Sequence, residues 1–334
     1  MLSMEMENQT VSDGDRPEEK FMDPDGLIAT RFIISGIGII TNAFVILVLL
    51  YNKIYKKSLT HLLIFQQSAI DMVACIMMLA FFTPSAPSDG GAVFFCKILN
   101  IFWCATYAST YNLVIITIER YIAVLHPKFF RRHFRDKKGR LVLILPYIIG
   151  MLTGIELFVY AGYDEVTGHC TYYYSARVFW GAVFFTTQYI VPVIAMAFCY
   201  ARILINLRER AVPQAKTISR SNTDNTRTWL RKAQRSLIYT ICFVGIAFFI
   251  TVSPNKIIFF LYTACGCFEF SDIIIIYELS IILNTMNLSI NPIIYTFTFY
   301  DFKRGMKKLK LDIMNKMGHS ADEEMTPTPM SSTI

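Results

Sequence analysis

Residues 28–51 read IATRFIISGIGIITNAFVILVLLY, a long apolar run near the start of the chain. A helix needs about 20 such residues to cross the hydrocarbon layer of a bilayer. Further runs of this kind lie at residues 61–84, 93–125, 141–161, 178–206, 230–262 and 272–299. The sequence therefore predicts an all-α membrane protein, a bundle of seven transmembrane helices.

The overall composition also indicates a membrane protein. Of the 334 residues, 54% are apolar and 17% are charged, which excludes an ordinary soluble protein. The polar stretches outside the runs are too short to bury a core of their own. We therefore expect an acidic N-terminal tail over residues 1–26, a membrane domain over 27–300, an amphipathic eighth helix over 301–316 and a disordered tail over 317–334.

Basic residues gather in the connections on one side of the predicted bundle. Residues 51–60, 126–140 and 201–236, and the segment after the last helix, all carry more Lys and Arg than Asp and Glu. Because such loops face the cytoplasm, we expect a multi-pass plasma-membrane protein with its N-terminus outside and its C-terminus inside. The net charge of +7 reflects this face and does not indicate nucleic-acid binding. Asn8-Gln9-Thr10 is then an outward-facing glycosylation acceptor.

The predicted topology sorts the eight cysteines. Cys96 opens the third helix on the outer side, and Cys170 lies in the outer loop between helices four and five. That environment is oxidising, so we expect these two cysteines to form a disulfide. Cys265 and Cys267 flank a glycine in the last outer loop. A bridge between them stays open, although so tight a ring is strained.

Polar residues inside the apolar runs are expensive and therefore informative. Asp71 lies within the second helix, and an unpaired charge there costs roughly 2.5 to 3.5 kcal/mol. Ser109 in helix three and Asn287 and Asn291 in helix seven supply further oxygens. Such oxygens favour a small hard cation, which we expect to be a non-obligatory, allosteric sodium ion. The alternative is an uncharged Asp71 that is hydrogen-bonded in a polar seam.

Two short motifs close helices three and seven. The first is Ile118-Glu119-Arg120-Tyr121 and the second is Asn291-Pro292-Ile293-Ile294-Tyr295. Over residues 28–316 the chain resembles the rhodopsin-like (class A) G-protein-coupled receptors, most of all their peptide-receptor branch. The motifs match the family's acid-Arg-Tyr and Asn-Pro-x-x-Tyr patterns, and Cys96 and Cys170 match its disulfide. Asn42, Asp71 and Pro192 match landmark positions of helices one, two and five.

The resemblance implies a switch between two packings of the bundle. In the inactive packing Glu119 holds Arg120. In the active one the inner end of helix six, hinged at Pro254, swings outward and opens a cavity for a G-protein helix. The residues to which the resemblance assigns this switch are Glu119, Arg120, Tyr121, Tyr200, Phe248, Pro254, Asn291, Pro292 and Tyr295.

Three departures from the family pattern concern this switch. Tyr147 stands where helix four usually has Trp, and Val252 replaces the Trp that precedes the helix-six proline. Gln234 takes the place of the acid that often pins the motif arginine. We therefore expect a looser switch than usual.

The outer half of the bundle indicates the class of ligand. Helix three holds no acid above Glu119, which argues against biogenic amines, and Thr285 stands where an opsin has its retinal-binding Lys. Lys256 either meets a ligand anion or pairs with Glu278. The tyrosines at 172–174 and the acidic tail favour a peptide with basic groups over a lipid or nucleotide. The expected ligand-binding residues are Phe102, Trp103, Thr106, Phe184, Asn255, Lys256, Phe259, Tyr277, Glu278 and Ile281.

The expected function is thus a receptor that binds an extracellular peptide and activates a heterotrimeric G protein. A receptor for a small organic anion or lipid, and a transporter or channel, are the alternatives. We find no pairing of a nucleophile with a base in the sequence, so nothing in it suggests an enzyme. Further expected partners are membrane lipids, arrestin at the hydroxyl-rich tail, and a PDZ-domain protein at the terminal Ser332-Thr333-Ile334.

Overall fold

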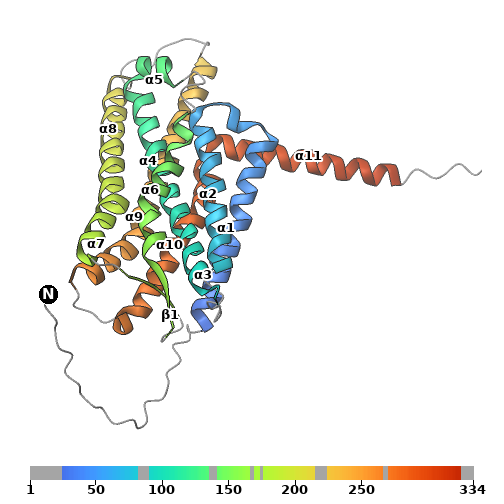
Figure 1. The fold of residues 1–334 in the computed structure, drawn as a ribbon. Coiled ribbons are helices and arrows are strands. Elements are labelled where there is room, and N and C mark those ends of the chain that lie inside the picture. Colours follow the sequence, from blue (N-terminus) through green and yellow to red (C-terminus); the bar gives the residue numbers. More distant parts are fainter. Residues whose placement is uncertain are drawn as a thin grey trace, which may run out of the picture.

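The computed structural model describes residues 25–81, 90–134, 141–165, 169–173, 176–214, 224–265 and 270–324. Figure 1 shows a bundle of long helices, from which one helix leaves at an angle. In chain order the elements are α1 (Asp25–Tyr51), η1 (Ile54–Lys56), α2 (Leu59–Phe81), α3 (Ala92–Ile98), α4 (Asn100–Leu125), α5 (Pro127–His133), α6 (Leu145–Tyr160), β1 (Ala161–Asp164), β2 (His169–Tyr172), α7 (Arg177–Phe185), η3 (Thr186–Ile190), α8 (Val191–Gln214), α9 (Asp224–Cys265), α10 (Phe270–Thr298) and α11 (Tyr300–Glu324). The all-α bundle predicted from the sequence is confirmed.

Six described segments are long and apolar enough to cross a membrane: Gly26–Tyr51, Leu59–Ala80, Ala92–Leu125, Leu141–Tyr160, Val178–Asn206 and Ser236–Ala264. α10 carries buried polar side chains such as Asn284, Asn287 and Asn291 along its length. It still packs against α1 and α9. It is therefore the seventh member of the bundle.

The third and fifth apolar runs each fold as more than one helical piece. In the third, α3 ends at Ile98 and α4 begins at Asn100. In the fifth, the π-helical turn η3 separates α7 from α8. Pro192, just after this turn, has no backbone N–H and its ring crowds the carbonyl four residues earlier. A locally wider turn relieves that conflict.

Two helices extend beyond their predicted bounds. α9 begins at Asp224 rather than at residue 230, and it ends at Cys265. α11 continues to Glu324, past the end predicted at residue 316. Apolar runs mark only the part of a helix that meets lipid, whereas Lys, Arg, Gln and Glu are good helix formers that extend it into water.

The helix faces sort by polarity as a bilayer requires. Large apolar side chains stay exposed on the outer surface, with 71% of Ile40 and 70% of Phe297 accessible. Asn42, Gln67 and Asp71 are fully buried between the helices. Because lipid offers no hydrogen-bond partners, polar groups turn toward the interior of the bundle.

The two ends of the bundle hold separate clusters of buried side chains. We name them the disulfide end, where the β1–β2 hairpin lies, and the α11 end, where α11 begins (Figure 1). The cluster at the α11 end includes Val114, Phe248, Tyr295, Phe299 and Phe302. The cluster at the disulfide end includes Phe102, Trp103, Tyr107, Phe184 and Ile281, with Tyr172 packed against it.

The hairpin is tied to the bundle by the expected disulfide. β1 and β2 pair antiparallel, with Tyr163 opposite Cys170. Cys170 is bridged to Cys96 in α3, with 5.4 Å between their Cα atoms. The predicted bridge is therefore confirmed, and it ties the hairpin to α3.

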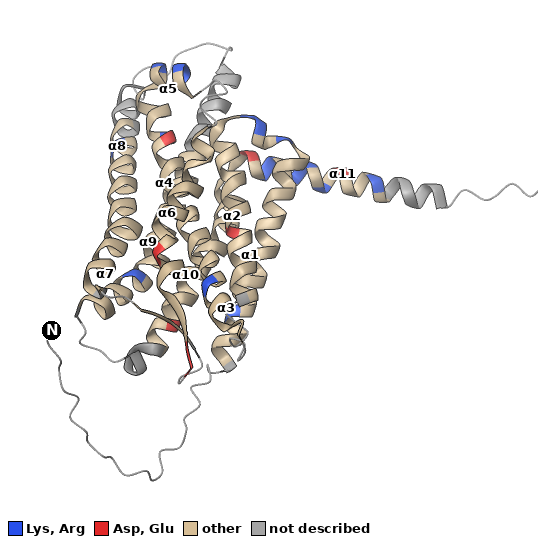
Figure 2. Cartoon of the chain, in the orientation of Figure 1, with Lys and Arg blue, Asp and Glu red and all other residues tan. Residues whose placement is uncertain are grey.

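α11 is amphipathic and lies against η1. Phe302 and Leu309 are buried, while the Lys and Arg residues along the helix are exposed and are coloured blue in Figure 2. Gly305 permits the close approach, because a Cβ there would lie 2.8 Å from Ile54 Cδ1. Asn52 Nδ2 donates to the Gly305 carbonyl at 3.1 Å. α11 is thereby fixed to the connection between α1 and α2.

Candidate functional site

A buried polar site joins α2, α4 and α10 in the middle of the bundle. Ser109 Oγ donates to Asp71 Oδ1 at 2.6 Å, and Asn291 Nδ2 donates to Asp71 Oδ2 at 2.9 Å. Asn287 lies apart from these contacts and accepts from Thr251 Oγ1 of α9 at 3.3 Å. The structure therefore brings three of the four expected cation-site residues into direct contact and links the fourth to α9.

Gln67 is a member of this site that the sequence analysis did not identify. Its Nε2 donates to Asp71 Oδ1 at 2.9 Å and to Ser109 Oγ at 2.6 Å. Its Oε1 accepts from Asn112 Nδ2 at 2.8 Å. Gln67 precedes Asp71 by one helical turn, which puts both on one face of α2. That spacing is the signal that would have found it.

The oxygens of the site suit a small hard cation. The Asp71 carboxylate and the Ser109 hydroxyl are oxygen ligands of the kind that such cations take. Asn291 Oδ1 is buried without a hydrogen-bond partner. These oxygen ligands therefore fit a sodium ion. The Gln67 amide, which donates to Asp71, would compete with the ion for the same carboxylate.

At the α11 end, the two charged residues of the Glu119-Arg120-Tyr121 motif in α4 bind each other. Arg120 Nε donates to Glu119 Oε2 at 2.6 Å, and an Nη donates to Glu119 Oε1 at 2.5 Å. Glu119 is buried and also accepts from Thr60 Oγ1 of α2 at 2.7 Å. This two-pronged contact is the strong form of an Arg–carboxylate pair. It matches the inactive packing that the family resemblance implies.

Tyr200 connects α8 to the two helices beside it. Its hydroxyl lies 3.0 Å from Thr117 Oγ1 of α4 and donates to the Ile241 carbonyl of α9 at 2.8 Å. Gly245 of α9 leaves room for the ring, because a Cβ there would lie 2.5 Å from it. Tyr200 thus connects the half of α9 nearer the α11 end to α4 and α8.

The other expected switch residues lie on α4, α9 and α10. Phe248 and Tyr295 are buried in the cluster at the α11 end. Pro254 and Pro292 lie inside α9 and α10, where proline removes a backbone hydrogen bond. Tyr121 packs its ring against Phe198 of α8, with centroids 5.9 Å apart.

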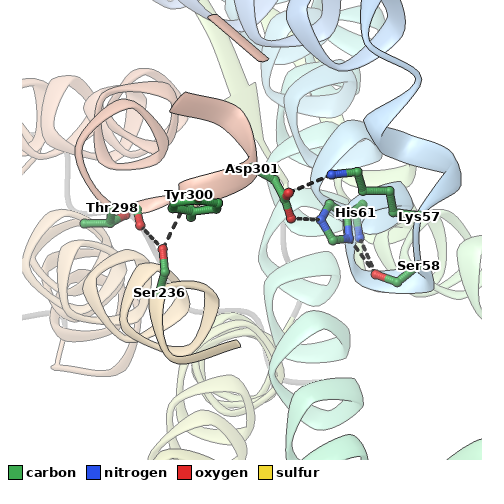
Figure 3. A network of polar contacts seen from close by, with 7 residues as sticks. All are labelled: Lys57, Ser58, His61, Ser236, Thr298, Tyr300 and Asp301. Carbon is green, nitrogen blue, oxygen red and sulfur yellow. Dashed lines mark hydrogen bonds and ion pairs between the residues drawn. The ribbon is translucent and has the colours of Figure 1, made fainter. Parts of the chain in front are cut away.

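A polar joint holds the start of α11 to both α2 and α9 (Figure 3). Ser236 Oγ donates to the Thr298 carbonyl and accepts from the Tyr300 N–H at 3.0 Å. Asp301 bonds to Lys57 Nζ at 2.6 Å and to His61 Nε2 at 3.0 Å. The hydrogen bond with His61 holds the pKa of Asp301 at about 2, below its ordinary 3.8, and Lys57 adds to this against the effect of burial.

Most of the expected ligand-binding residues meet at the disulfide end. Phe102, Trp103, Phe184 and Ile281 share one buried cluster, against which Phe259 and Tyr277 pack. Thr106 is buried, and its hydroxyl donates to the Phe102 carbonyl of the same helix at 2.9 Å. Asn255 donates to Ser280 Oγ at 3.2 Å. Tyr172, one of the loop tyrosines expected to favour a peptide, packs against the same cluster, and Tyr107 belongs to it without having been in the expected set.

Glu278 does not pair with Lys256, the alternative that the sequence analysis left open. Its Oε2 forms an ion pair with an Nη of Arg31 in α1. Lys256 Nζ is buried with no hydrogen-bond partner. It lies between 5.0 and 5.2 Å from the ring centroids of Trp103, Tyr107 and Phe184.

The departures from the family pattern have different surroundings. Val252 is fully buried in the cluster at the α11 end, whereas Tyr147 is 46% exposed on the outer surface. Thr285 is buried and bonds within α10. Asn8, Cys267, Ile334 and the side chains of Gln234 and Cys265 lie outside the part of the chain that the structure describes.

Comparison with known proteins agrees with this geometry. The family model "7 transmembrane receptor (rhodopsin family)" matches residues 41–295. The allatostatin-A receptor of Bombyx mori is 22% identical over 286 residues, 82% of this chain and 76% of that protein. The galanin receptor type 1 of Rattus norvegicus is 24% identical over 307 residues, which cover 87% of this chain and 84% of that protein. The somatostatin receptor type 4 of the same species is 23% identical over 305 residues, which cover 86% of this chain and 74% of that protein. Because the family match spans most of the chain, this protein belongs to the rhodopsin family of seven-transmembrane receptors.

Proposed function

We propose that this receptor binds a secreted peptide at the disulfide end and activates a heterotrimeric G protein at the α11 end. As a member of its family it is a multi-pass receptor of the plasma membrane and not an enzyme. Its relatives are named as receptors for allatostatin-A, somatostatin and galanin. The aromatic cluster at the disulfide end offers the broad amphipathic contact area that suits a peptide.

Charge supports an outward-facing disulfide end. Lys and Arg gather along α11, on α5 and between α1 and α2, all at the α11 end of the bundle (Figure 2). Basic segments stay on the cytoplasmic side, and disulfides persist outside the cell. The N-terminus is then extracellular and the C-terminus cytoplasmic.

The observation that carries the proposal is the closed contact set at the α11 end. Glu119 clamps Arg120, and Tyr200 bonds to the Ile241 carbonyl of α9. An outward swing of α9 about Pro254 breaks the Tyr200 contact and opens the space in front of Arg120. Arg120 then leaves Glu119 and offers its guanidinium to the carbonyl groups at the end of a G-protein helix.

Nucleotide exchange with purified receptor in nanodiscs tests the function. A library of secreted-type peptides is expected to contain members that accelerate GTP binding to a heterotrimeric G protein. Arg120→Ala should keep peptide binding and abolish the acceleration, whereas Lys316→Ala, at an exposed position on α11, should change neither. Solute flux without nucleotide exchange would instead support a transporter.

A sodium ion is proposed as an allosteric ligand of the buried polar site. Asp71, Ser109 and Asn291 would hold it, with Asn287 linking the site to α9. The cation supplies a positive charge that balances the Asp71 carboxylate. A ligand of this kind stabilises the closed packing if it binds that packing more tightly than the open one.

Cytoplasmic partners beyond the G protein are proposed from the chain end and from α11. The exposed apolar side chains Leu311, Ile313 and Met314 and the basic residues of α11 suit an anionic membrane surface. Phosphorylation of the hydroxyl-rich tail would recruit arrestin, and the terminal Ser332-Thr333-Ile334 suits a PDZ domain. Pull-downs with unmodified and Ser332-phosphorylated tail peptides test the PDZ proposal. The unmodified peptide should capture the PDZ protein, and the phosphorylated one should lose it.

A further inference from the structure

Lys256 lies deep in the bundle with an incomplete set of partners. It follows Pro254 in the outer half of α9, and the residue is 2% exposed. Its Nζ has no hydrogen-bond partner. A buried ammonium group without an acceptor is costly, so this position is expected to have a function that offsets the cost.

Aromatic rings surround the ammonium group from two other helices. The centroids of Trp103 and Tyr107 in α4 lie 5.1 and 5.2 Å from Nζ, and that of Phe184 in α7 lies 5.0 Å away. Cation–π contacts of this kind are each worth up to about 2 kcal/mol when desolvated. They orient the charge, but they leave its three N–H donors without oxygen acceptors.

The nearest acid expected from the sequence is engaged elsewhere. Glu278 forms an ion pair with Arg31 of α1. The counter-charge for Lys256 is therefore not supplied by Glu278. An anion from outside the chain would complete the site.

A second orphaned polar side chain lies on the neighbouring element. Gln188 in the π-turn η3 is 1% exposed, and both of its amide atoms lack partners. The next residue, Tyr189, bonds to Ser253 Oγ at 2.6 Å. Ser253 precedes Lys256 by three residues and so shares its face of α9. The π-turn therefore faces the side of α9 that carries Lys256.

We propose that Lys256 and its aromatic surroundings form a subsite for a carboxylate group of the ligand. The inference rests on the proposed peptide-receptor function and specifies the chemistry of the deepest ligand group. The carboxylate accepts from Nζ, while an adjoining aromatic or aliphatic group packs among Trp103, Tyr107 and Phe184. A C-terminal carboxylate beside an aromatic residue has this shape. The ligand would thus carry an acidic group at its deep end, beside Lys256. Its basic groups, which the acidic N-terminal tail favours, would lie nearer the surface.

Two small probes test the subsite without knowledge of the natural peptide. Purified receptor in nanodiscs is titrated with 3-phenylpropionate and with 3-phenylpropanol, its uncharged analogue, and the melting temperature is followed. The carboxylate should stabilise the wild type and Lys256→Arg. Lys256→Met should weaken its apparent affinity at least tenfold, and the alcohol should show no such dependence. Equal responses to acid and alcohol, or an unchanged response in Lys256→Met, would overturn the proposal.

Matched variants separate this role from a structural one. Lys256→Met removes an unpaired buried charge and should raise the melting temperature of the ligand-free receptor; a structural lysine would lower it. Lys97→Met changes an exposed lysine of α3 at the same end and should leave both probe responses intact.

The peptide arm separates failure of this inference from failure of the proposed function. Library peptides are prepared with a free C-terminal carboxylate and as C-terminal amides, and G-protein nucleotide exchange is measured. Active peptides should need an acidic group, and Lys256→Met should remove that requirement. If no peptide activates the receptor, the peptide function fails, and the phenylpropionate titration still decides the Lys256 subsite.

Discussion

At the scale of single residues, Gln67 changes how the buried polar site is expected to behave. An amide that donates to both Asp71 and Ser109 already offers positive partial charge to the carboxylate. A sodium ion must displace those bonds before it reaches the same oxygens. Gln67 is therefore expected to weaken the response of the receptor to sodium.

Basal nucleotide exchange in millimolar sodium, with choline at the same ionic strength as reference, measures this response. Wild-type receptor should show a modest reduction in exchange. Gln67→Leu should enlarge it, to roughly 5-fold or more, because the cation no longer competes with the amide. Asp71→Asn should remove the effect. If Gln67→Leu responds like the wild type, the amide does not compete with sodium.

At the scale of elements, the joint around Ser236 connects α9 to the junction of α10 and α11. Ser236 Oγ contacts the backbone of Thr298 and Tyr300 on either side of that junction (Figure 3). An outward swing of α9 must break both contacts. The joint is therefore expected to stabilise the closed packing.

Ser236→Ala should raise agonist-independent nucleotide exchange roughly 2- to 10-fold, because a net hydrogen bond contributes about 0.5 to 1.5 kcal/mol. Thr298→Val is the matched control. It removes a hydroxyl that bonds within α10 and keeps the carbonyl that accepts from Ser236. A control variant as active as Ser236→Ala would mean that the joint does not restrain α9.

The same junction contains an acid whose ionised form the fold favours. The pKa of Asp301 is lowered from 3.8 to about 2, chiefly by the hydrogen bond with His61. A lowered pKa means that this stabilisation is present above about pH 4 and is lost as the pH falls toward 2. Asp301→Asn should therefore lower the melting temperature at neutral pH, and the difference from wild type should shrink between pH 4 and pH 2. A difference that stays constant over this range would contradict the role of ionisation.

At the scale of the whole molecule, the separation of charge between the two ends predicts the orientation in the membrane. Basic residues gather at the α11 end (Figure 2), and the disulfide lies at the other. Receptor expressed in animal cells should carry a glycan on Asn8, and Asn8→Gln should abolish the mass shift on enzymatic deglycosylation. An N-terminal epitope should bind antibody on intact cells. Binding only after permeabilisation would reverse the orientation.

The sequence by itself determined the class of fold and the positions of the two motifs to which the switch is assigned. The bilayer demands long apolar helices, and their length is visible in one dimension; the paired motifs ending in Tyr121 and Tyr295 are contiguous and match the family in order. The Cys96–Cys170 bridge followed from topology and resemblance, and the structure confirms it. Helix breaks such as the π-turn η3 were not visible, because they depend on how Pro192 fits into the packed bundle.

Only the tertiary structure decided which buried polar groups pair. Arg31 and Glu278 are 247 residues apart in the chain, and no local pattern connects them. Once they are paired, Lys256 is left among aromatic rings without an acid. Gln67 likewise looked like an ordinary polar residue until α2, α4 and α10 came together around Asp71. Inside a membrane each polar group must find its partner across helices, so the identity of the partners is a property of the assembled bundle.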